Sequence, residues 1–338
     1  EAEAFRRLKA EAAAASSRPP LTGCGGCASN TAKVLARLGC RAALCGGIGR
    51  DEVAGAFRKR LESCGLQDLT QEAGEDCPDT GEVLCLVTPA GERTFAYRPG
   101  ASSSLTPEGL SRALEAHTAS TGSPAFVYFD VYTFLCPGEL AEEGMRMARR
   151  LGAKVGLNLG SPGIVAEGGQ RLLALLREGL VDALFMNEDE AQALGDAAGV
   201  LPNRDAEGEA LSKGGTEGEA DASGAEAAEA VAEAVCASTS AYCSLAVVTL
   251  GERGLWAAVG GPGARPERHR VAAATVVDST GAGDFFAGGF LAAWLRGLPV
   301  EACAAGGAAA AARVLGVLGA DLAEKDWDGL RAGCLGEA

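Results

Sequence analysis

The chain has 338 residues, of which 47% are hydrophobic, and its formal net charge at pH 7 is −15. A chain of this length can bury a large core, organised as one large domain or as two unequal ones. The acidic balance argues against general affinity for nucleic acid, and no apolar run reaches membrane-spanning length. We therefore expect neither nucleic acid nor a membrane as a partner.

The 12 cysteines are scattered along the chain without paired spacing. Cys24 and Cys27 form a C-x-x-C motif, but no second pair follows at the spacing of a zinc site. Reduced thiols packed as small hydrophobic side chains are the favoured interpretation, and redox chemistry at this motif is the alternative. Because thiols persist in reducing compartments, we expect an intracellular protein, either cytoplasmic or in an organelle such as the plastid after loss of a transit peptide.

The predicted elements begin with an N-terminal helix over residues 1–15. A linker with the helix-breaking sequence Ser-Ser-Arg-Pro-Pro follows, so that helix and linker together occupy residues 1–22. Residues 23–330 form the main domain, and residues 331–338 form a C-terminal tail.

Within the main domain, segments with helical and strand periodicity alternate. Helices are predicted over residues 31–38, 53–63, 140–151 and 170–178, and strands over residues 42–45, 125–130, 154–159, 183–186, 245–250, 255–259 and 274–277. This alternation predicts an α/β fold with a doubly wound, mostly parallel sheet flanked by helices. Two alternating segments, residues 82–88 and 93–98, predict a β-hairpin outside the main sheet.

Residues 201–235 differ in composition from the rest of the chain. They contain nine Asp or Glu and two Lys or Arg, with many Ala, Gly and Ser and no aromatic residue. Such a segment buries too little apolar surface to fold, so we expect a disordered acidic insertion over about residues 201–240. A regulatory tail is the alternative interpretation.

Residues 278–284 read Asp-Ser-Thr-Gly-Ala-Gly-Asp and open a long apolar helix. The free N–H groups at a helix start carry partial positive charge and can hold an anion, here at Gly281, Ala282 and Gly283. Asp284 places a carboxylate at the mouth of that site. An anion cradle with a base beside it is what phosphoryl transfer to a hydroxyl requires. The alternative is a plain strand-to-helix turn whose aspartate complements the helix dipole.

A second glycine-rich segment, residues 23–30, leads into the helix predicted over residues 31–38. Gly25 and Gly26 allow the backbone to approach a ligand closely, and Asn30 offers a donor and an acceptor to a polyhydroxylated ligand. The alternative is an Asn N-cap after a flexible loop. The glycine spacing does not match a dinucleotide-binding fingerprint, which argues against a nicotinamide-dependent dehydrogenase.

Polar residues follow two further strands, at the edge of the sheet where α/β folds bind ligands. Asn187 and Glu190 come after the strand 183–186, where they could hold Mg²⁺ through water or simply belong to an acidic first helical turn. Thr249 lies near the end of the strand 245–250, and Gly251 and Gly254 follow that strand. A nucleotide could pass close to these glycines, although a hairpin turn explains them equally.

Taken together and in this order, the motifs resemble the PfkB (ribokinase-like) family of carbohydrate and nucleoside kinases. The resemblance runs from about Gly23 to Gly319, apart from the acidic insertion, and is carried by residues 25–39, 46–55, 187–190 and 278–284. Residues 87–94 are similar to the adenosine-kinase-like branch. The resemblance implies a ribokinase-like fold with a small β lid, to which the hairpin 82–98 would belong.

The resemblance also implies an ATP- and Mg²⁺-dependent kinase acting on a hydroxyl of a sugar or nucleoside. Asp284 would be the general base, and the anion hole would be formed by the amides of Gly281, Ala282 and Gly283. The implied nucleotide-binding residues are Asn187, Thr249, Gly251 and Gly254, and the implied Mg²⁺ residues, acting through water, are Asn187 and Glu190. The acceptor pocket would be lined by Gly25, Gly26 and Asn30. Asn158, a weaker match that ends a strand, would approach phosphate.

One feature departs from the family pattern. Family members begin with a strand that carries a substrate-binding aspartate, whereas this chain begins with a predicted helix. Either the chain is a fragment or this segment has been lost, so the acceptor pocket and the lid are expected to be incomplete. A catalytically weak or inactive binding or assembly module is therefore the alternative function. Because lids of the family often pair, we also expect a homodimer through the lid.

Overall fold

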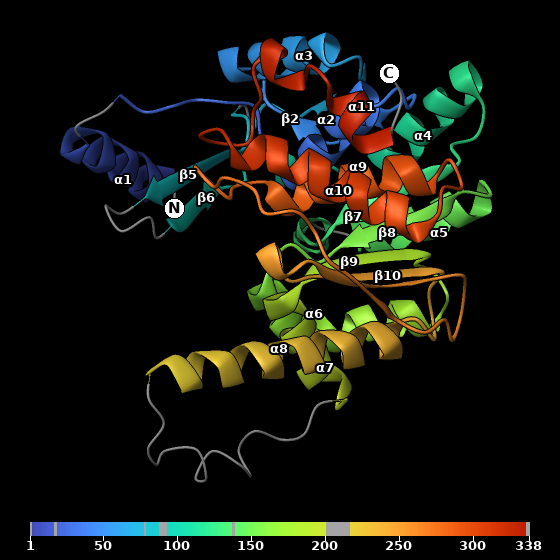
Figure 1. Ribbon diagram of the computed structural model, residues 1–338. Coiled ribbons are helices and arrows are strands. Elements are labelled where there is room, and N and C mark those ends of the chain that lie inside the picture. Colours follow the sequence, from blue (N-terminus) through green and yellow to red (C-terminus); the bar gives the residue numbers. More distant parts are fainter. Residues whose placement is uncertain are drawn as a thin grey trace.

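The centre of the molecule is a six-stranded sheet. The computed structural model describes residues 2–16, 19–77, 79–87, 93–136, 139–200 and 217–335. The strands of the main sheet are β7 (Phe126–Asp130), β8 (Lys154–Asn158), β9 (Ala183–Asn187), β10 (Leu245–Thr249), β11 (Leu255–Val259) and β12 (Glu267–His269). Their order is β12-β11-β10-β9-β8-β7 (Figure 1). Strands β7 to β10 are parallel, and β11 pairs antiparallel with both of its neighbours, so the predicted mostly parallel sheet is confirmed.

The two faces of this sheet bury different residues of the same strands. In β9, Leu184 and Met186 pack into one hydrophobic cluster, whereas Ala183 and Phe185 pack into another. Successive side chains of a strand point to opposite faces, so both faces of this strand are apolar and both need a cover. Helices provide it on each side, which is the doubly wound arrangement expected from the sequence.

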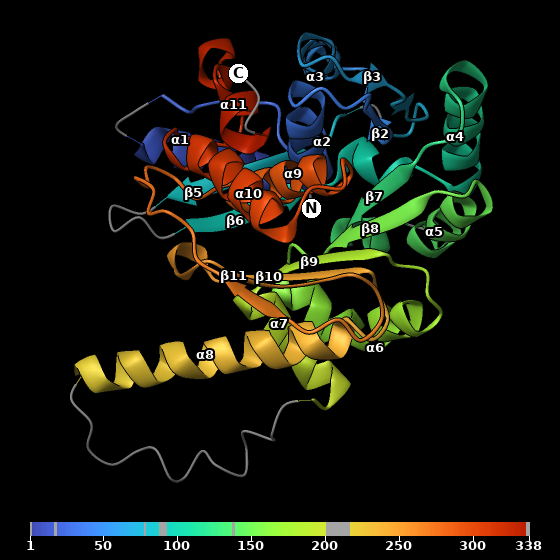
Figure 2. The same ribbon diagram turned by 45° about the vertical axis from the view of Figure 1, so that its right-hand side comes forward.

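The helices lie above and below the sheet in Figures 1 and 2. One face is covered by α5 (Leu140–Arg150), α6 (Pro162–Arg177), α7 (Glu188–Ala198) and α8 (Glu217–Thr239), with α4 (Pro107–Thr121) beside α5. The other face is covered by α9 (Ala282–Trp294) and α10 (Val300–Leu315), with α2 (Cys27–Arg37) beside α9. Within the described ranges, none of the helices combines the length and the hydropathy that crossing a bilayer requires.

The register of the sheet brings four polar residues to one edge. Asp130 pairs with Asn158 across β7 and β8, and Asn187 pairs with Thr249 across β9 and β10. These residues end four parallel strands, so they lie along the carboxyl edge of the sheet, where open α/β sheets bind their ligands.

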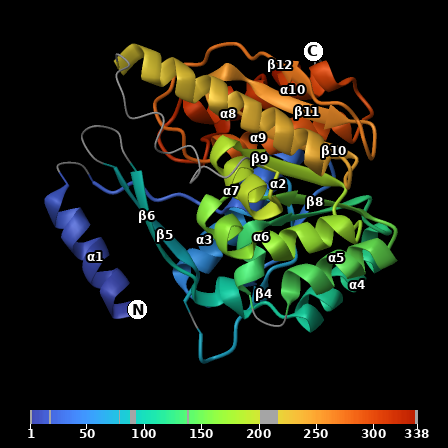
Figure 3. The ribbon, with the colours of Figure 1, turned by 90° about the horizontal axis from the view of Figure 1, so that it is seen from below.

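The predicted hairpin is confirmed outside the main sheet. β5 (Glu82–Val87) pairs antiparallel with β6 (Arg93–Arg98), and residues 88–92 of the prediction lie outside the described residues. Helix α1 (Ala2–Ala15), also predicted, lies alongside the hairpin in Figure 3. Lys9 of this helix forms an ion pair with Glu82 of the hairpin.

Short elements follow α2 along the chain. They are β1 (Ala43–Leu44), β2 (Gly47–Ile48), α3 (Glu52–Ser63), β3 (Gln67–Asp68) and β4 (Gln71–Glu72). β1 pairs with β3, and β2 pairs with β4, as two small parallel sheets. Among the described residues, β7 has a strand partner on one side only, which is β8.

Helix α2 begins at Cys27, one turn earlier than expected. Gly26 is its N-cap, and the Ala28 amide donates to the Asp130 carboxylate at 3.1 Å. This acceptor comes from a distant strand, so local sequence could not reveal it. Asn30 is therefore the fourth residue of the helix, and its interpretation as an N-cap is wrong.

Helix α6 also begins earlier than expected, at Pro162 instead of residue 170. The Ser161 hydroxyl caps it by accepting the Ile164 amide, and proline occupies the first helical turn, where its missing N–H costs no hydrogen bond. The other predicted helices and strands are confirmed within a few residues, with one exception.

Residues 274–277 do not form the predicted strand. The amides of Val277 and Asp278 both bond the Leu315 carbonyl, and the side chains of Val276 and Val277 are 63% and 59% exposed. The β-branched composition suggested a strand, but such a preference produces one only where a neighbouring edge is available.

The disorder expected over residues 201–240 is wrong for the part that α8 occupies. Ala232, Val235 and Cys236 recur at helical spacing and pack into the cluster on the sheet. Residues 201–216 lie outside the described residues. The expected C-terminal tail also begins inside a helix, α11 (Leu330–Leu335), which buries Leu330 and Cys334.

The packing of α9 on α10 leads to a testable prediction. A Cβ at Gly289 would lie 2.4 Å from the Gly306 carbonyl oxygen. We therefore expect Gly289→Ala to lower the free energy of unfolding by about 1–3 kcal/mol through overpacking. The matched control is Gly168→Ala on α6, where a Cβ would meet nothing within 4 Å, so alanine should raise stability by up to about 1 kcal/mol. Urea unfolding followed by circular dichroism measures both, and equal effects would contradict the close packing.

Candidate active site

The candidate site forms where the first turns of α2 and α9 meet (Figure 2). Asn30 donates from Nδ2 to Asp284 Oδ2 at 3.0 Å, and the Thr31 hydroxyl donates to the Asp284 main-chain carbonyl at 3.1 Å. The helices approach this closely because Gly288 lacks a side chain, since a Cβ there would lie 2.7 Å from Val34 Cβ. Two predicted site residues, 254 positions apart, are thus in direct contact.

The turn before α9 is fixed by one glycine and one aspartate. Gly281 is the N-cap with φ of 77°, a left-handed conformation that favours glycine. Asp278 accepts from the Thr280 amide at 2.9 Å, from the Thr280 hydroxyl at 2.8 Å and from the Gly319 amide at 2.9 Å. The predicted anion-binding residues, 281–283, therefore lie at a helix start, where the dipole is positive and amides have no partner within the helix. The Ala282 amide donates to the Ser279 carbonyl at 3.2 Å, just outside the helix.

Asp284 is 7% exposed, and burial raises the pKa of its carboxyl to about 6. Hydrogen bonds from Asn30 and from the Cys27 thiol lower this pKa, as does the charge of Lys33, whereas Asp130 raises it further. At neutral pH the carboxylate is therefore ionised but more basic than an ordinary aspartate. Such a group can take a proton from a hydroxyl in a transition state.

Asp130 was not among the predicted site residues. It ends β7, and its carboxylate faces α2 through the hydrogen bond with the Ala28 amide. Burial raises the pKa of this carboxyl, against hydrogen bonds from the amides of Ala28, Tyr132 and Thr133. Its position as the last residue of a predicted strand was the available signal, because that edge of a parallel sheet carries ligands.

Asn187 and Glu190 form a capping box at the start of α7. Asn187 Oδ1 accepts the Glu190 amide at 2.8 Å, while the Glu190 carboxylate accepts the Asn187 main-chain amide at 2.9 Å and the side-chain amide at 3.0 Å. Glu190 is 4% exposed, and burial raises the pKa of its carboxyl to about 7. The motif therefore begins a helix, as one of its two interpretations predicted. No cationic side chain among the described residues pairs with Glu190.

Thr249, Gly251 and Gly254 lie at the carboxyl end of β10, on the predicted edge. Gly254 has a structural reason to be glycine, because its φ is 96° and a Cβ would lie 2.2 Å from the His269 carbonyl oxygen. At Gly251 a Cβ would meet nothing within 4 Å. Gly251 is therefore the glycine of this motif that a ligand could approach.

Gly25 and Gly26 are the two middle residues of the C-x-x-C motif, and its second cysteine, Cys27, begins α2. A Cβ at Gly25 would meet nothing within 4 Å, so the backbone there is open to a ligand. The thiols of Cys24 and Cys27 are free, and burial raises the pKa of both. Thiols of raised pKa stay protonated at neutral pH, which disfavours the redox alternative.

Two more residues complete the carboxyl edge of the sheet. Asn158, the weaker match to the family pattern, is 8% exposed beside Asp130. Tyr132, which the sequence did not reveal, is 40% exposed and donates to the Gly160 carbonyl at 3.3 Å. An aromatic ring at this edge offers an apolar surface to a ligand, with its hydroxyl already bonded.

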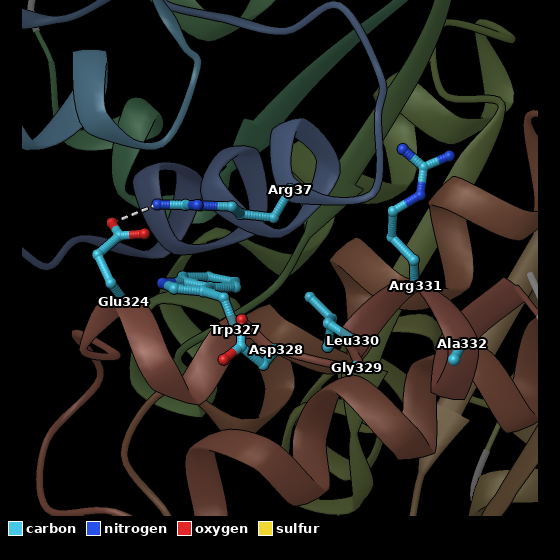
Figure 4. A pocket seen from close by; sticks show the side chains of 8 residues that line it. All are labelled: Arg37, Glu324, Trp327, Asp328, Gly329, Leu330, Arg331 and Ala332. Atoms are coloured by element: carbon cyan, nitrogen blue, oxygen red, sulfur yellow. Dashed lines mark hydrogen bonds and ion pairs between the residues drawn. The ribbon is translucent and has the colours of Figure 1, made fainter. Parts of the chain in front are cut away.

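A cavity of about 380 Å³ lies elsewhere, between α2 and the C-terminal segment (Figure 4). There Arg37 lies over the Trp327 ring, 5.4 Å from its centroid, and pairs with Glu324. None of the predicted site residues lines this cavity. The candidate site is therefore defined by the strand ends and the two helix starts.

Known proteins resemble the chain in sequence and in structure. A model of the pfkB family of carbohydrate kinases matches residues 20–327. The guanosine-inosine kinase of Escherichia coli (strain K12) is 32% identical over 143 residues, which cover 41% of this chain and about a third, 31%, of that protein.

Two solved structures match nearly the whole chain. The adenosine kinase from Sinorhizobium meliloti has a TM-score of 0.76 and 27% identity, covering 98% of this chain and 88% of that one. A probable sugar kinase from Rhizobium etli CFN 42 has a TM-score of 0.76 and 26% identity, covering 99% and 88%. Since the family match spans most of the chain and the same fold recurs in these kinases, the chain belongs to the pfkB family of carbohydrate kinases, as the order of its motifs predicted.

Proposed function

We propose that the protein transfers the terminal phosphoryl group of ATP to a hydroxyl of a sugar or nucleoside, with Asp284 as the general base. The observation that carries the proposal is the contact between Asn30 and Asp284, which holds a buried carboxylate beside the amides that open α9. Membership of a kinase family supports the reaction class.

In the proposed reaction, Asp284 accepts the proton of the acceptor hydroxyl while the hydroxyl oxygen attacks the γ-phosphorus. The new O–P bond forms to the acceptor, and the bond from the γ-phosphorus to the bridging oxygen breaks, leaving its electron pair on ADP. The products are a phosphomonoester, ADP and a proton that Asp284 releases. A pKa of about 6 for Asp284 suits both the uptake and the release of this proton. At neutral pH the carboxylate is ionised and can accept the proton, and it loses the proton again after the transfer.

The amides of the turn 281–283 are proposed to stabilise negative charge on the transferring phosphoryl group. Backbone donors at a helix start are fixed before the reaction and need no reorganisation during it. The hydrogen bonds of Asp278 to Thr280 and Gly319 hold the turn in this conformation. The proposed anion hole is therefore part of the rigid fold.

Asn187 and Glu190 are proposed to hold Mg²⁺ through water, and Thr249 and Gly251 to lie beside the nucleotide, while Gly254 shapes the turn behind them. The Glu190 carboxylate fits this role, since it is buried without a cationic partner among the described residues and a bound cation would offset that cost. Its oxygens already accept hydrogen bonds from Asn187, which favours contact through water over direct coordination. When bound, Mg²⁺ neutralises charge on the phosphates.

The acceptor is proposed to lie over Gly25, Gly26 and Asn30. Asn30 Oδ1 is buried without a hydrogen-bond partner among the described residues, so a hydroxyl of a polyol could satisfy it. Asp130 offers a further acceptor on the same side. Nucleosides are supported by the names of the guanosine-inosine and adenosine kinases, and sugars by that of the probable sugar kinase.

An ADP-release assay across a panel of sugars and nucleosides tests the function. We expect turnover with at least one of them in the presence of ATP and Mg²⁺. A protein that binds ATP but is silent with every acceptor would instead be a non-catalytic binding or assembly module.

Removing the Asp284 carboxylate should lower turnover strongly without affecting nucleotide binding. We expect Asp284→Asn to lower kcat by about 10²–10⁴-fold, because an amide cannot accept the acceptor proton. The Kd for ATP, measured by calorimetry, should change little. The control is Asp182→Asn at the opposite edge of the sheet, where Asp182 accepts from the Val155 amide at 2.7 Å. Equal turnover of Asp284→Asn and wild type would refute the role of base.

The same variant should be more stable than wild type at neutral pH. The folded pKa of Asp284, about 6, lies above its ordinary value of 3.8, so the ionised carboxylate destabilises the fold at neutral pH and the protonated one does not. Asp284→Asn should therefore raise the free energy of unfolding by on the order of 3 kcal/mol at pH 7.5, and by about half as much at pH 5. Urea titrations at the two pH values measure this gain. A gain that grew towards acid pH would contradict the raised pKa.

We also propose that the protein forms a homodimer through the hairpin of β5 and β6. One face of the hairpin exposes Val83, Val87, Phe95 and Tyr97, each more than half exposed, and Val83 pairs directly with Tyr97. A contiguous apolar face of this kind is self-complementary around a two-fold axis. Light scattering after size exclusion should give a dimer, and Phe95→Asp/Tyr97→Asp a monomer, while Val53→Asp on α3 leaves the dimer intact. A wild-type monomer at micromolar concentration would overturn this.

A further inference from the structure

An ion pair between the buried Lys33 and the partly buried Asp321 holds the loop that carries Gly25 and Gly26. Lys33 on α2 has an exposed fraction of 0%, and its Nζ donates to the Cys24 carbonyl at 2.5 Å and lies 3.4 Å from Asp321 Oδ1. Asp321 Oδ2 in turn accepts the Cys24 amide at 3.0 Å. Both main-chain polar groups of Cys24, the residue just before Gly25, are therefore held by one charged pair.

Arg60 on α3 completes the charge balance around Asp321. Its Nε donates to Asp321 Oδ1 at 2.8 Å, and its guanidinium also donates to the Leu322 carbonyl. Burial acts to raise the pKa of Asp321, but Lys33, the Cys24 amide and Arg60 together hold it below its ordinary value. Asp321 is therefore ionised at neutral pH and accepts three hydrogen bonds from three different parts of the chain.

The residues just before Asp321 touch the other half of the site. The Gly319 amide donates to Asp278 at 2.9 Å. The Ala320 methyl lies so close to the turn that a Cβ at Gly281 would be 2.7 Å from it. The segment 319–321 therefore contacts both the turn before α9 and the loop before α2.

We propose that Lys33 and Asp321 are positioning residues. They would set the distance between the loop of residues 24–26, here called the acceptor loop, and the turn of residues 281–283, here called the phosphoryl-binding turn. The inference rests on the proposed function for what these two halves bind. An apolar pair of similar volume would avoid the desolvation of two charges. It could not hold both the amide and the carbonyl of Cys24, and the two glycines that follow restrict the backbone less than other residues would. Misplacing reacting groups by about 1 Å can slow a reaction by about 10²-fold.

The first test is Lys33→Met, which removes the donor to the Cys24 carbonyl but leaves Asp321 paired with Arg60. With ATP and the best acceptor from the panel, we expect KM for that acceptor to rise at least 10-fold, while the Kd for ATP stays within twofold. The double variant Lys33→Met/Asp321→Asn, which has neither charge, should also raise the KM for the acceptor without changing the Kd for ATP. The control is Asp182→Asn. The Asp182 carboxylate also accepts from an arginine and from a main-chain amide, but it lies far from the loop, so this variant should leave both constants unchanged.

The second test needs no acceptor. Amide hydrogen exchange of the peptide that spans residues 24–28 should be at least 10-fold faster in Lys33→Met than in wild type, with exchange in α7 unchanged. If wild type phosphorylates nothing, the proposed function fails, but this exchange measurement still decides whether the pair orders the loop. Unchanged exchange and an unchanged acceptor KM in Lys33→Met, or equal changes in Asp182→Asn, would overturn the proposal.

Discussion

The contact between the first turns of α2 and α9 is the constraint on which the site depends. It exists because Gly288 presents no side chain to Val34, which lets the two helix starts approach until Asn30 reaches Asp284. A larger residue at position 288 would push the helices apart and move the Asp284 carboxylate away from the loop of Gly25 and Gly26. The chemistry of the site is therefore set by helix packing on one face of the sheet.

This arrangement has a cost in stability, which the proposed function explains. Asp284 is buried, and no cationic side chain among the described residues bonds it directly, so its pKa rises to about 6. A fold optimised for stability alone would place an amide or an apolar residue there. The pair of Lys33 and Asp321 also has a cost, because the Lys33 charge is fully buried and the Asp321 charge is partly buried to fix one main-chain segment.

Much of the fold followed from the sequence, because apolar strands and helices alternate with strong periodicity. The late motif correctly placed Asp284 and the turn 281–283 at a helix start. Asn187 and Thr249 lie at the carboxyl edge of the sheet as expected, because each is within one residue of the end of a predicted strand.

The misses share one physical cause, which is that distant contacts override local preference. The start of α2 depends on Asp130, 102 residues away from Ala28. Residues 274–277 have strand composition but bond Leu315 instead of a strand. Nothing in the local sequence marks Lys33 as buried, because its partner Asp321 lies 288 positions later in the chain. Acidic composition suggested disorder for α8, yet Ala232, Val235 and Cys236 give it a buried face.

The most direct test of the proposed site is a crystal structure of the protein with Mg²⁺ and a non-hydrolysable ATP analogue. We expect the terminal phosphate within hydrogen-bond distance of the amides of residues 281–283, with the Asp284 carboxylate facing the space over Gly25 and Gly26. A nucleotide bound with its terminal phosphate elsewhere, or an Asp284 carboxylate turned away from it into an ion pair, would contradict the proposed roles of these residues.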